Sequence, residues 1–401
     1  MEKTSRITSV SLKNYKSIAS ARVSLSPLTV LVGRNGAGKS NFVEALWLLS
    51  DAVQSTLDHA IRQHGGIGDV RRRSGGHPTH FGISLRLQLA DGRSAAYAFM
   101  VGATKDGGFT VQREKAAIGV DGLNDPHFEL DDGVLVSKST HLNLAPRISS
   151  DRLFLTYVSS IPEFRILFDT LSQMHFYSIN PTEIRQPQPH DAGDVLLRSG
   201  KNIASLMRRL ATDDPESFDR IQDYIRSIVP GLEGVEHESL GPTETLRFRQ
   251  KVQTNKNPWR FYAAAMSDGT LRSLGILAAL FQTNSRKVSP TLIGIEEPES
   301  TIHPGAASIL TDALIEASKR HQVIATTHSP DLLDNANLSL ESIRVVESVD
   351  GETIIGDADA AAKEAVRSKL YTPGELLRHG QINPAPPSRP QSDAINLFKF
   401  D

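Results

Sequence analysis

The glycine-rich segment at residues 33–40, GRNGAGKS, has the residue types of a phosphate-binding loop. It fits the pattern G-x-x-x-x-G-K-[ST], in which glycines let backbone N–H groups approach an anion closely. The lysine is expected to reach the β- and γ-phosphates of a nucleoside triphosphate, and the serine hydroxyl is expected to ligate Mg²⁺. The sequence therefore predicts a site for ATP and Mg²⁺ formed by Gly33, Asn35, Gly36, Gly38, Lys39, Ser40 and Asn41, with the serine as a metal ligand.

Two adjacent acids follow an apolar run at residues 291–295, TLIGI. A buried strand delivers its last side chains to the carboxyl edge of a parallel sheet, where a phosphate-binding loop also opens. We expect Glu296 to hold Mg²⁺ or its water, and Glu297 to act as general base toward the attacking water. A solvated acidic turn is the alternative interpretation, and the phosphate-loop pattern makes it the weaker one.

Two further positions could contact a bound triphosphate. His328 follows the apolar stretch VIAT, so its imidazole is expected at the end of a strand, where it could sense the γ-phosphate. A lone histidine is more often structural, but its position roughly 30 residues after the acids favours catalysis. Ser267 and Gly269 open a predicted helix whose positive end suits an anion, although plain N-capping by Ser267 or Asp268 explains the same residues.

The elements that position these residues follow from hydrophobic periodicity. The run LTVLV at 28–32 predicts a strand buried on both faces directly before the glycine loop, and 41–50 predicts a helix directly after it. Further strands are expected between 7 and 25, within 82–119, near 246–252, and at 291–295, 321–326 and 343–347. Further helices are expected at 161–179, 193–212, 214–229, 267–282 and 304–318.

Five motifs in this order resemble those of the ABC-like ATPases of the SMC, RecF and OLD group. They are residues 33–40, MSDGTLR at 266–272, IGIEEPES at 293–300, IHP at 302–304 and TTHSP at 326–330. The segment SLKNYKSI at 11–18 is similar to the first strand of that group. The EEPE…HP box is most similar to the bacterial OLD-like or AAA-type ATPases.

The resemblance implies an α/β fold, a two-lobed ABC-type P-loop ATPase head with a compact, mainly helical insertion or lid. Residues 1–155 are then expected to form an N-lobe with antiparallel strands, and 156–240 the helical insertion. Residues 241–360 are expected to form the C-lobe, and 361–401 a C-terminal tail that includes the proline-rich stretch 384–392. Prolines and glycines interrupt the interval before Ser267, so a long coiled-coil arm is not expected there.

The resemblance also implies an ATPase whose catalytic residues are Lys39, Glu297 and His328. Two chains are expected to pair head to head around two ATP molecules. Ser267 and Gly269 of one chain would then contact the nucleotide bound by the other.

Other features of the family pattern are less settled in this sequence. Tyr15 and Lys16 lie where such heads contact the nucleotide, and Gln63 and Gln88 both remain open as the Q-loop glutamine. The first acid, Glu296, stands where Asp is commoner, and the signature reads SDG rather than SGG. Both departures are features of the OLD-like branch.

The composition excludes several classes of chemistry. Apolar residues make up 39% and charged residues 22% of the 401 residues, which is typical of a folded globular protein. The absence of cysteine excludes disulfides, thiolate zinc sites and cysteine nucleophiles. No apolar run reaches the roughly 18 to 20 residues of a membrane span, and the polar N-terminus does not resemble a signal peptide. We therefore expect a cytoplasmic protein with no membrane partner.

A formal net charge of −2 means that any nucleic-acid contact must come from a local basic patch. Arg71, Arg72 and Arg73 form the sharpest cluster and could bind DNA or RNA phosphates, with a solvated charged loop as an equal alternative. Asp357 and Asp359 superficially supply the D-x-D metal pair of a Toprim nuclease. About 42 residues follow them, fewer than the ~100 of such a domain, so a loop or helix start is expected.

The leading hypothesis is an ATP-hydrolysing dimer that drives or gates a separate effector, such as a nuclease or toxin, in bacterial antiphage defence. A RecF-like repair ATPase that binds DNA directly is the second hypothesis. The third is an ATP-gated scaffold or sensor, in which turnover only resets an assembly. The sequence leaves open the effector, the trigger and any assembly beyond a dimer.

Overall fold

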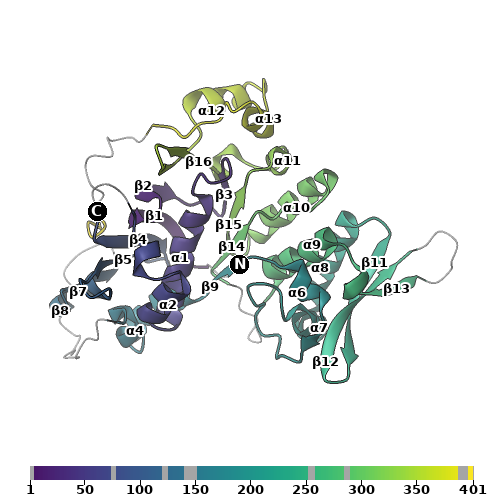
Figure 1. Ribbon diagram of the computed structural model, residues 1–401, viewed down its shortest axis with the longest axis horizontal. Coiled ribbons are helices and arrows are strands. Elements are labelled where there is room, and N and C mark those ends of the chain that lie inside the picture. The colour runs from purple at the N-terminus through teal and green to yellow at the C-terminus, as the bar shows by residue number, and fades with distance from the viewer. Residues whose placement is uncertain are drawn as a thin grey trace. The chain divides into compact units, whose positions relative to one another are not determined.

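The computed structural model describes residues 4–73, 78–119, 125–139, 151–251, 258–283, 290–386 and 396–400. The chain divides into two compact units, each built from separated segments of sequence (Figure 1). Unit 1 comprises Met1–Met174, Glu341–Ala361 and Ile382–Asp401, and unit 2 comprises His175–Leu340 and Ala362–Gln381. The division at residues 155, 240 and 360 that was expected from the sequence stays a prediction.

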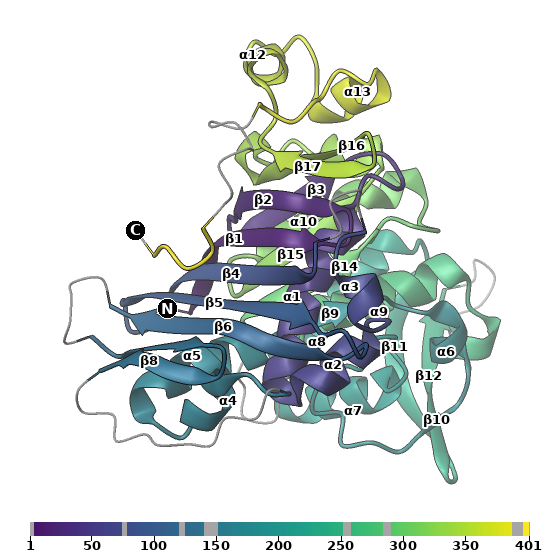
Figure 2. The same cartoon turned by 60° about the vertical axis from the view of Figure 1, so that its left-hand side comes forward.

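Unit 1 contains an antiparallel sheet with the strand order β2-β1-β4-β5-β6-β7-β8 among its described residues. Figure 2 shows β2, β1, β4, β5 and β6 following one another across this sheet. Asp91-Gly92 turns the chain between β4 and β5, with Gly92 at φ 90°. The strands are β1 Arg6–Tyr15, β2 Ile18–Ser24, β4 His80–Gln88, β5 Ser94–Ala103, β6 Phe109–Ile118, β7 His127–Asp131 and β8 Val134–Lys138.

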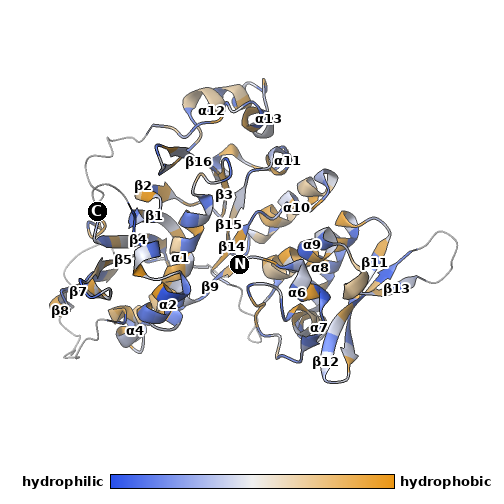
Figure 3. Ribbon diagram, viewed as in Figure 1, coloured by the Kyte–Doolittle hydropathy of each residue, from blue (hydrophilic) through white to orange (hydrophobic). Residues whose placement is uncertain are grey.

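The glycine loop connects β3 (Leu28–Val32) to α1 (Lys39–Gln54) within unit 1. All β3 residues are buried, as the continuous apolar run predicted. β3 pairs in parallel with β16 (Ile343–Val349), and β16 pairs antiparallel with β17 (Glu352–Gly356). α1 carries both hydrophobic and hydrophilic residues (Figure 3). Its buried face includes Phe42, Leu46, Leu49 and Val53, which recur at helical spacing.

Four short helices complete unit 1 among the described residues. They are α2 Leu57–Gln63, α3 Ile67–Val70, α4 Phe154–Val158 and α5 Pro162–Ser172. The fully buried carboxylate of Glu114, on β6, accepts hydrogen bonds from the backbone N–H groups of Phe154 and Leu155 at 2.6 and 2.9 Å. It thereby satisfies donors at the N-terminus of α4. Burial raises the pKa of Glu114 to about 7.

Unit 2 contains a parallel pair, β14 (Leu292–Glu296) and β15 (Gln322–Thr327). The β15 residues are all buried, and so are the first four residues of β14. Both strands were predicted from their apolar runs. In sequence, α9 (Asp268–Phe281) precedes β14, α10 (Pro304–Ala317) lies between β14 and β15, and α11 (Pro330–Leu333) follows β15.

A second sheet of unit 2 has the order β10-β12-β11, with β13 paired to β12. Its strands are β10 Gln188–Pro189, β11 Leu232–Leu240, β12 Thr243–Gln250 and β13 Trp259–Tyr262. In sequence, α6 Pro181–Arg185 precedes β10, α7 Ile203–Asp213 and α8 Pro215–Ile228 lie between β10 and β11, and the 3-10 turn η1 Ala263–Ala265 follows β13. A second 3-10 turn, η2 Leu340–Ser342, directly precedes β16. Among the described helices, none combines the length and apolar character that crossing a membrane requires.

Two of the expected helices are shorter in the structure than the sequence predicted. The helix expected at 161–179 ends at Ser172, because the chain then turns into β9 (Met174–Tyr177). The helix expected at 193–212 begins only at Ile203, after a loop.

The segment 361–401 was expected to be a tail, yet it carries two helices, α12 (Ala360–Arg367) and α13 (Pro373–Arg378). Within unit 2, Arg378 holds α13 in place through ion pairs with Asp331 at 2.7 Å and Asp334 at 2.9 Å. Within unit 1, Leu397 and Phe398 pack against Ala98. Residues 387–392 of the proline-rich stretch lie outside the described residues.

Candidate functional site

The glycine loop of unit 1 has the backbone that its sequence requires. Gly36 and Gly38 adopt φ values of 79° and 101°, a region that glycine enters without a steric penalty. A Cβ at Gly33 would lie 2.0 Å from the carbonyl oxygen of Val346, so only glycine fits beside β16. Asn35, Gly36 and Ser40 are exposed. The loop therefore presents its tip to solvent while its base is packed.

Lys39 is buried, with 5% of its surface exposed. Its Nζ donates hydrogen bonds to the carbonyl oxygens of Gly33 at 2.8 Å and Arg34 at 3.0 Å. These bonds curl the side chain back over the loop. A loop whose ammonium group is already held among its own carbonyls is suited to a triphosphate, because the cation needs little rearrangement to meet the phosphates.

A network of hydroxyl hydrogen bonds, which sequence reasoning missed, supports the base of the glycine loop. Asn41 donates from Nδ2 to Ser17 Oγ at 2.7 Å, and the hydroxyls of Ser17 and Thr353 lie 2.6 Å apart. Thr353 donates to the carbonyl oxygen of Ala37 at 2.9 Å, and its side chain fills the space beside Gly38. No local pattern identifies Thr353, because it lies more than 300 residues from the loop it supports.

A charged cluster fixes helix α1 behind the loop. His64 is fully buried, and its two ring nitrogens each lie 3.1 Å from a carboxylate of α1, Nδ1 from Glu44 and Nε2 from Asp51. Burial lowers the pKa of His64, but the hydrogen bonds and charges of Asp51 and Glu44 outweigh it and raise the pKa overall. Lys16 pairs with Glu44, and Tyr15 is buried, so both residues act in the structure as supports of this region.

In unit 2, the paired acids follow β14. Glu297 adopts φ 44°, a left-handed conformation that is uncommon for a residue with a side chain. Its backbone N–H donates to the carbonyl oxygen of Thr326 at 3.0 Å, which fixes the turn to the end of β15. Its carboxylate meets His328 Nδ1 at 3.2 Å and Ser300 Oγ at 3.3 Å. The structure therefore brings together the two residues that were expected to catalyse hydrolysis from this part of the chain.

Glu299 is a third acid of this turn that sequence reasoning gave no role. Thr327 donates to its Oε1 at 2.5 Å, and its Oε2 is buried without a hydrogen-bond partner among the described residues. Burial raises the pKa of Glu299. The acidic E-E-P-E spacing was the available signal, but it could not separate a buried acid from an exposed one.

The serine-glycine turn begins α9, as predicted. Ser267 is the N-cap, and its Oγ accepts a hydrogen bond from the Thr270 N–H at 3.2 Å, so the capping interpretation holds. Ser267 is also exposed, which leaves its hydroxyl accessible. A Cβ at Gly269 would lie 2.5 Å from the carbonyl oxygen of Thr301, so the turn packs tightly against the segment after the acids.

The order of these motifs matches a known family. A family model described as "AAA domain, putative AbiEii toxin, Type IV TA system" matches residues 28–334, which include the glycine loop, the serine-glycine turn, the acids and the histidine. The chain belongs to this AAA-domain family. It is a P-loop ATPase domain whose sequence is similar to OLD and RecF proteins and whose fold resembles SMC heads.

Of two curated proteins similar to this AAA domain, one is named as a nuclease and the other as a DNA replication and repair protein. The Old nuclease of Escherichia phage P2 is 26% identical over 374 residues, which are 87% of this chain and 60% of that protein. The chain thus spans less than two thirds of that relative. The DNA replication and repair protein RecF of Streptococcus agalactiae serotype Ia is 36% identical over 93 residues, which are 21% of this chain and 24% of that protein.

Solved structures confirm the predicted fold class. The Smc head domain with an extended coiled coil from Pyrococcus furiosus, bound to the C-terminal domain of ScpA, matches with a TM-score of 0.54 at 13% identity, covering 92% of this chain and 100% of that chain. An SmcHead bound to the C-winged helix domain of ScpA matches with a TM-score of 0.52 at 16% identity, covering 87% of this chain and 97% of that chain. The AAA domain is therefore a mixed α/β fold that resembles SMC and ABC-type ATPase heads.

The arginine cluster of this AAA domain has internal partners. Arg71 donates to the carbonyl oxygen of Pro78 at 2.9 Å, and Arg72 donates to the carbonyl oxygen of Ser17 at 2.8 Å and pairs with Glu352 at 3.2 Å. Arg73 is exposed and pairs with Asp69. Arg72 therefore supports the segment at Ser17, and binding of the cluster to nucleic acid stays a prediction.

Other residues singled out from the sequence lie apart from these groups. Gln63 ends α2, and Gln88 ends β4, where its Nε2 donates to the carbonyl oxygen of Gly92. Neither is shown to be a Q-loop residue. Asp357 follows β17 and pairs with Arg344 at 3.3 Å, and Asp359 directly precedes α12, as the loop interpretation of this pair expected.

The oxygen donors required for Mg²⁺ are present in each unit. Ser40 supplies a hydroxyl in unit 1 and Glu296 a carboxylate in unit 2, and both are ligand types that Mg²⁺ prefers. Mg²⁺ usually takes only one or two protein ligands and completes its shell with phosphate oxygens and water.

Proposed function

We propose that this AAA domain binds ATP with Mg²⁺ at residues 33–40 and hydrolyses it. Lys39 meets the β- and γ-phosphates, Ser40 and Glu296 hold Mg²⁺, and Glu297 takes a proton from the attacking water. The observation that carries the proposal is the contact between Glu297 and His328, 3.2 Å, in a turn anchored to the ends of two parallel strands. Such a carboxylate is held in one orientation and can act as a base without first being ordered.

We further propose that two chains pair head to head, and that Ser267 and Gly269 contact the ATP of the opposite chain. The exposed Ser267 hydroxyl at the N-terminus of α9 supports this, because a helix start favours an anion. The likeness of the fold to SMC heads supports this pairing by analogy, because the family resemblance implies heads that dimerise. His328 then senses the γ-phosphate from within the chain that binds the nucleotide.

The decisive experiment compares Glu297→Gln and Lys39→Ala with the wild-type protein. Glu297→Gln should keep ATP affinity within about threefold and lose 10²–10⁴-fold in turnover, because the amide cannot accept the proton. Lys39→Ala should weaken ATP binding itself. ATP affinity by calorimetry and phosphate release would be measured on the same samples. Wild-type turnover by Glu297→Gln would sink the assignment of the base.

The same variant separates a machine driven by hydrolysis from an ATP-gated scaffold. With ATP, Glu297→Gln should form a long-lived dimer, visible by light scattering. If that trapped dimer still supports activity of the whole system, the nucleotide gates an assembly. If activity is lost although the dimer forms, turnover drives the work.

We propose antiphage defence as the setting, with a separate nuclease or toxin as effector. The similarity to the Old nuclease of Escherichia phage P2 across most of the chain supports this setting. Phage plating on cells that express the chain with its neighbouring genes, wild type against Glu297→Gln, tests it. Equal plating efficiency in both strains and in an empty-vector control would remove the defence role.

Direct DNA binding, as in a RecF-like repair ATPase, is a second candidate, which the 93-residue similarity to RecF favours. Arg73 is the residue to test, because Arg71 and Arg72 hold the fold together. Arg73→Glu should abolish ATP-dependent DNA affinity, and the wild-type affinity should fall steeply with salt. Unchanged affinity in the variant would exclude this surface.

A further inference from the structure

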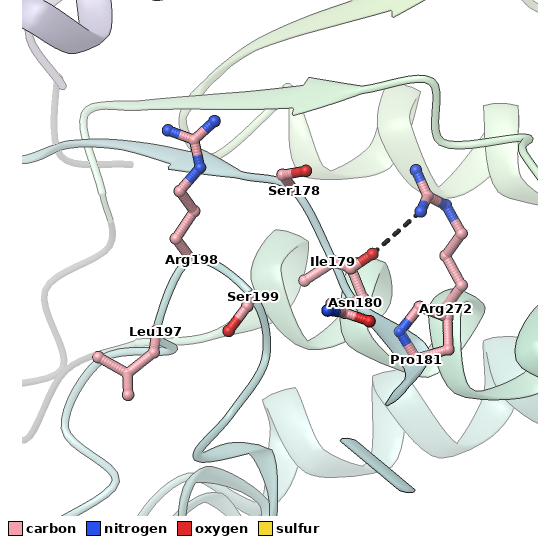
Figure 4. Close-up of a pocket in the computed structure, with 8 residues that line it drawn as sticks. All are labelled: Ser178, Ile179, Asn180, Pro181, Leu197, Arg198, Ser199 and Arg272. Atoms are coloured by element: carbon pink, nitrogen blue, oxygen red, sulfur yellow. Dashed lines mark hydrogen bonds between the residues drawn. The ribbon is translucent and has the colours of Figure 1, made fainter. Parts of the chain in front are cut away.

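A cavity of about 690 Å³ lies in unit 2, close to the acids but formed by different residues. Its wall combines two arginines with small polar residues and three apolar ones (Figure 4). The lining residues are Ser178, Ile179, Asn180, Pro181, Leu197, Arg198, Ser199 and Arg272. Figure 4 shows the guanidinium groups of Arg198 and Arg272 extending to the same side, with Ser178 between them in this view.

Arg272 enters this cavity from α9 in a fixed orientation. Its guanidinium donates to the carbonyl oxygen of Ile179 at 3.0 Å and to those of Glu296 and Glu297 at 3.1 Å. Its Nε is buried without a hydrogen-bond partner among the described residues. The guanidinium is therefore fixed by three backbone carbonyls, and the nearby carboxylates of Glu296, Glu297 and Glu299 attract its charge, so an anion in the cavity would share the cation with them.

Arg198 is the second cation of the cavity. Its guanidinium forms an ion pair with Glu296 at 3.8 Å, longer than a hydrogen bond, and its side chain is 34% exposed. Its backbone is fixed, because the carbonyl oxygen of Arg198 accepts from the Ser178 N–H at 3.1 Å and the next carbonyl, of Ser199, accepts from the Asn180 N–H at 2.9 Å. A fixed backbone with a partly exposed side chain suits a residue that exchanges partners.

We propose that this cavity binds a phosphate oxyanion, with Arg198 and Arg272 as its cationic ligands. Each guanidinium group presents planar N–H donors that match phosphate oxygens, and Ser178 and Asn180 add neutral donors. We assign the ligand as inorganic phosphate leaving the hydrolysis site, because the cavity adjoins the backbone and carboxylate of the acids. The choice of inorganic phosphate rests on the proposed function, whereas the binding of an oxyanion does not.

The ion pair between Arg198 and Glu296 couples this cavity to the metal. Glu296 is the proposed Mg²⁺ ligand, and one carboxylate oxygen shared with a guanidinium is less available to a cation. If Glu296 held Mg²⁺, the Arg198 guanidinium would lose this carboxylate as a partner and could pair with an anion in the cavity instead. Phosphate should therefore bind more tightly when Mg²⁺ is present, and Arg198 is where this linkage acts.

Equilibrium dialysis of radiolabelled inorganic phosphate tests the proposal on the full chain carrying Lys39→Ala, which removes the glycine-loop cation. Adding Arg198→Gln should weaken phosphate binding at least tenfold and abolish its enhancement by Mg²⁺. The matched control is Arg220→Gln, since Arg220 is also partly exposed and paired with a glutamate of unit 2. The control variant should bind phosphate with an affinity within twofold of that of the Lys39→Ala chain. Arg198→Lys should fall between them, because an ammonium lacks the planar fork.

Each other outcome has a defined meaning. Equal affinity with and without Arg198→Gln, or loss of all phosphate binding with Lys39→Ala alone, overturns the cavity assignment. If a single-stranded oligonucleotide binds through Arg198 and inorganic phosphate does not, the phosphate belongs to a nucleic acid and our choice of ligand is wrong. If phosphate binds through Arg198 but the wild-type chain never hydrolyses ATP, the oxyanion site stands and the proposed function fails. Circular dichroism of each variant identifies misfolding, and Arg198→Lys then replaces Arg198→Gln as the deciding variant.

Discussion

The guanidinium of Arg272 donates from Nη2 to the backbone carbonyl oxygen of Glu297 at 3.1 Å. The same nitrogen reaches the carbonyl oxygen of Glu296, and Nη1 reaches that of Ile179. Arg272 lies five residues after Ser267, on the helix whose start is proposed to contact the ATP of the opposite chain. A single side chain thus connects the start of that helix to the turn that carries the proposed base.

Arg272→Gln should therefore disturb coupling between the two nucleotides of a dimer more than it disturbs ATP binding. The amide supplies one donor group where the guanidinium supplies three bonds, so the turn of Glu297 loses its restraint. We expect turnover to fall tenfold or more and the Hill coefficient for ATP to move toward 1, with ATP affinity within threefold. Arg272→Lys should recover part of the turnover. Unchanged cooperativity in both variants would mean that Arg272 only stabilises the fold.

Gly33→Ala should destabilise unit 1, because its Cβ would lie 2.0 Å from a backbone oxygen of β16 that cannot move aside. Overpacking of this kind costs about 1–3 kcal/mol or more. Gly36→Ala is the matched control in the same loop, since no atom lies within 4 Å of the position that its methyl group would take and only its positive φ is penalised, by about 1–2 kcal/mol. Thermal unfolding of both variants checks that Gly33→Ala is the less stable of the two. A Gly33→Ala protein as stable as wild type contradicts the packing described for this loop.

Thr353→Val should weaken ATP binding although residue 353 belongs to none of the sequence motifs. Removing its hydroxyl leaves the carbonyl oxygen of Ala37 without this donor and breaks the link to Ser17. An unmade hydrogen bond at a buried group costs about 1–3 kcal/mol, and part of this should appear as a several-fold rise in the Kd for ATP. Thr353→Ser keeps the hydroxyl and should bind ATP as wild type does. Calorimetric titration with ATP separates the two, and equal affinities would show that the network does not act on the loop.

The sequence predicted the parts of the site whose chemistry lies in contiguous residues. The glycine loop, the acids after β14 and His328 after β15 each follow a strand whose apolar run marks it for burial. The contact between Glu297 and His328 was not predicted, although both were expected at strand ends, and two neighbouring parallel strands end at the same edge. Prediction succeeded where local pattern and fold agreed.

The residues that support the site could not be predicted, because their partners are distant in sequence. Ser17 and Thr353 meet across 336 positions, and neither lies in a pattern that indicates a phosphate loop. Burial of Glu299 and of Glu114 depends on which face the surrounding chain covers, and periodicity alone does not give this. The helix expected at 161–179 failed for a related reason, since a four-residue buried strand, β9, has no period of its own.

The cluster of His64 with Glu44 and Asp51 predicts a pH dependence of stability. The pKa of His64 is raised above its value of 6.5 in the unfolded chain, so the folded state binds the extra proton more tightly. This stabilisation is fully present below pH 6.5 and is lost as the pH rises through the raised pKa. The pKa of Glu44 is lowered, so its contribution is present above pH 4.5 and is lost as the pH falls through the lowered value. The cluster should therefore stabilise the fold most between pH 4.5 and 6.5.

His64→Gln removes the charge from this cluster, with Lys16 and the Trp47 ring as its other neighbours. Hydrogen bonds to charged groups contribute about 1.5–3 kcal/mol, and the partial exposure of both carboxylates places the expected loss near the lower end. The Tm difference from wild type should be largest near pH 6 and shrink toward pH 9. His59→Gln, at an exposed position of α2, should change the Tm little at any pH. A His64→Gln difference that is constant from pH 6 to 9 would show that His64 is neutral in the folded protein and that its packing, not its charge, holds α1.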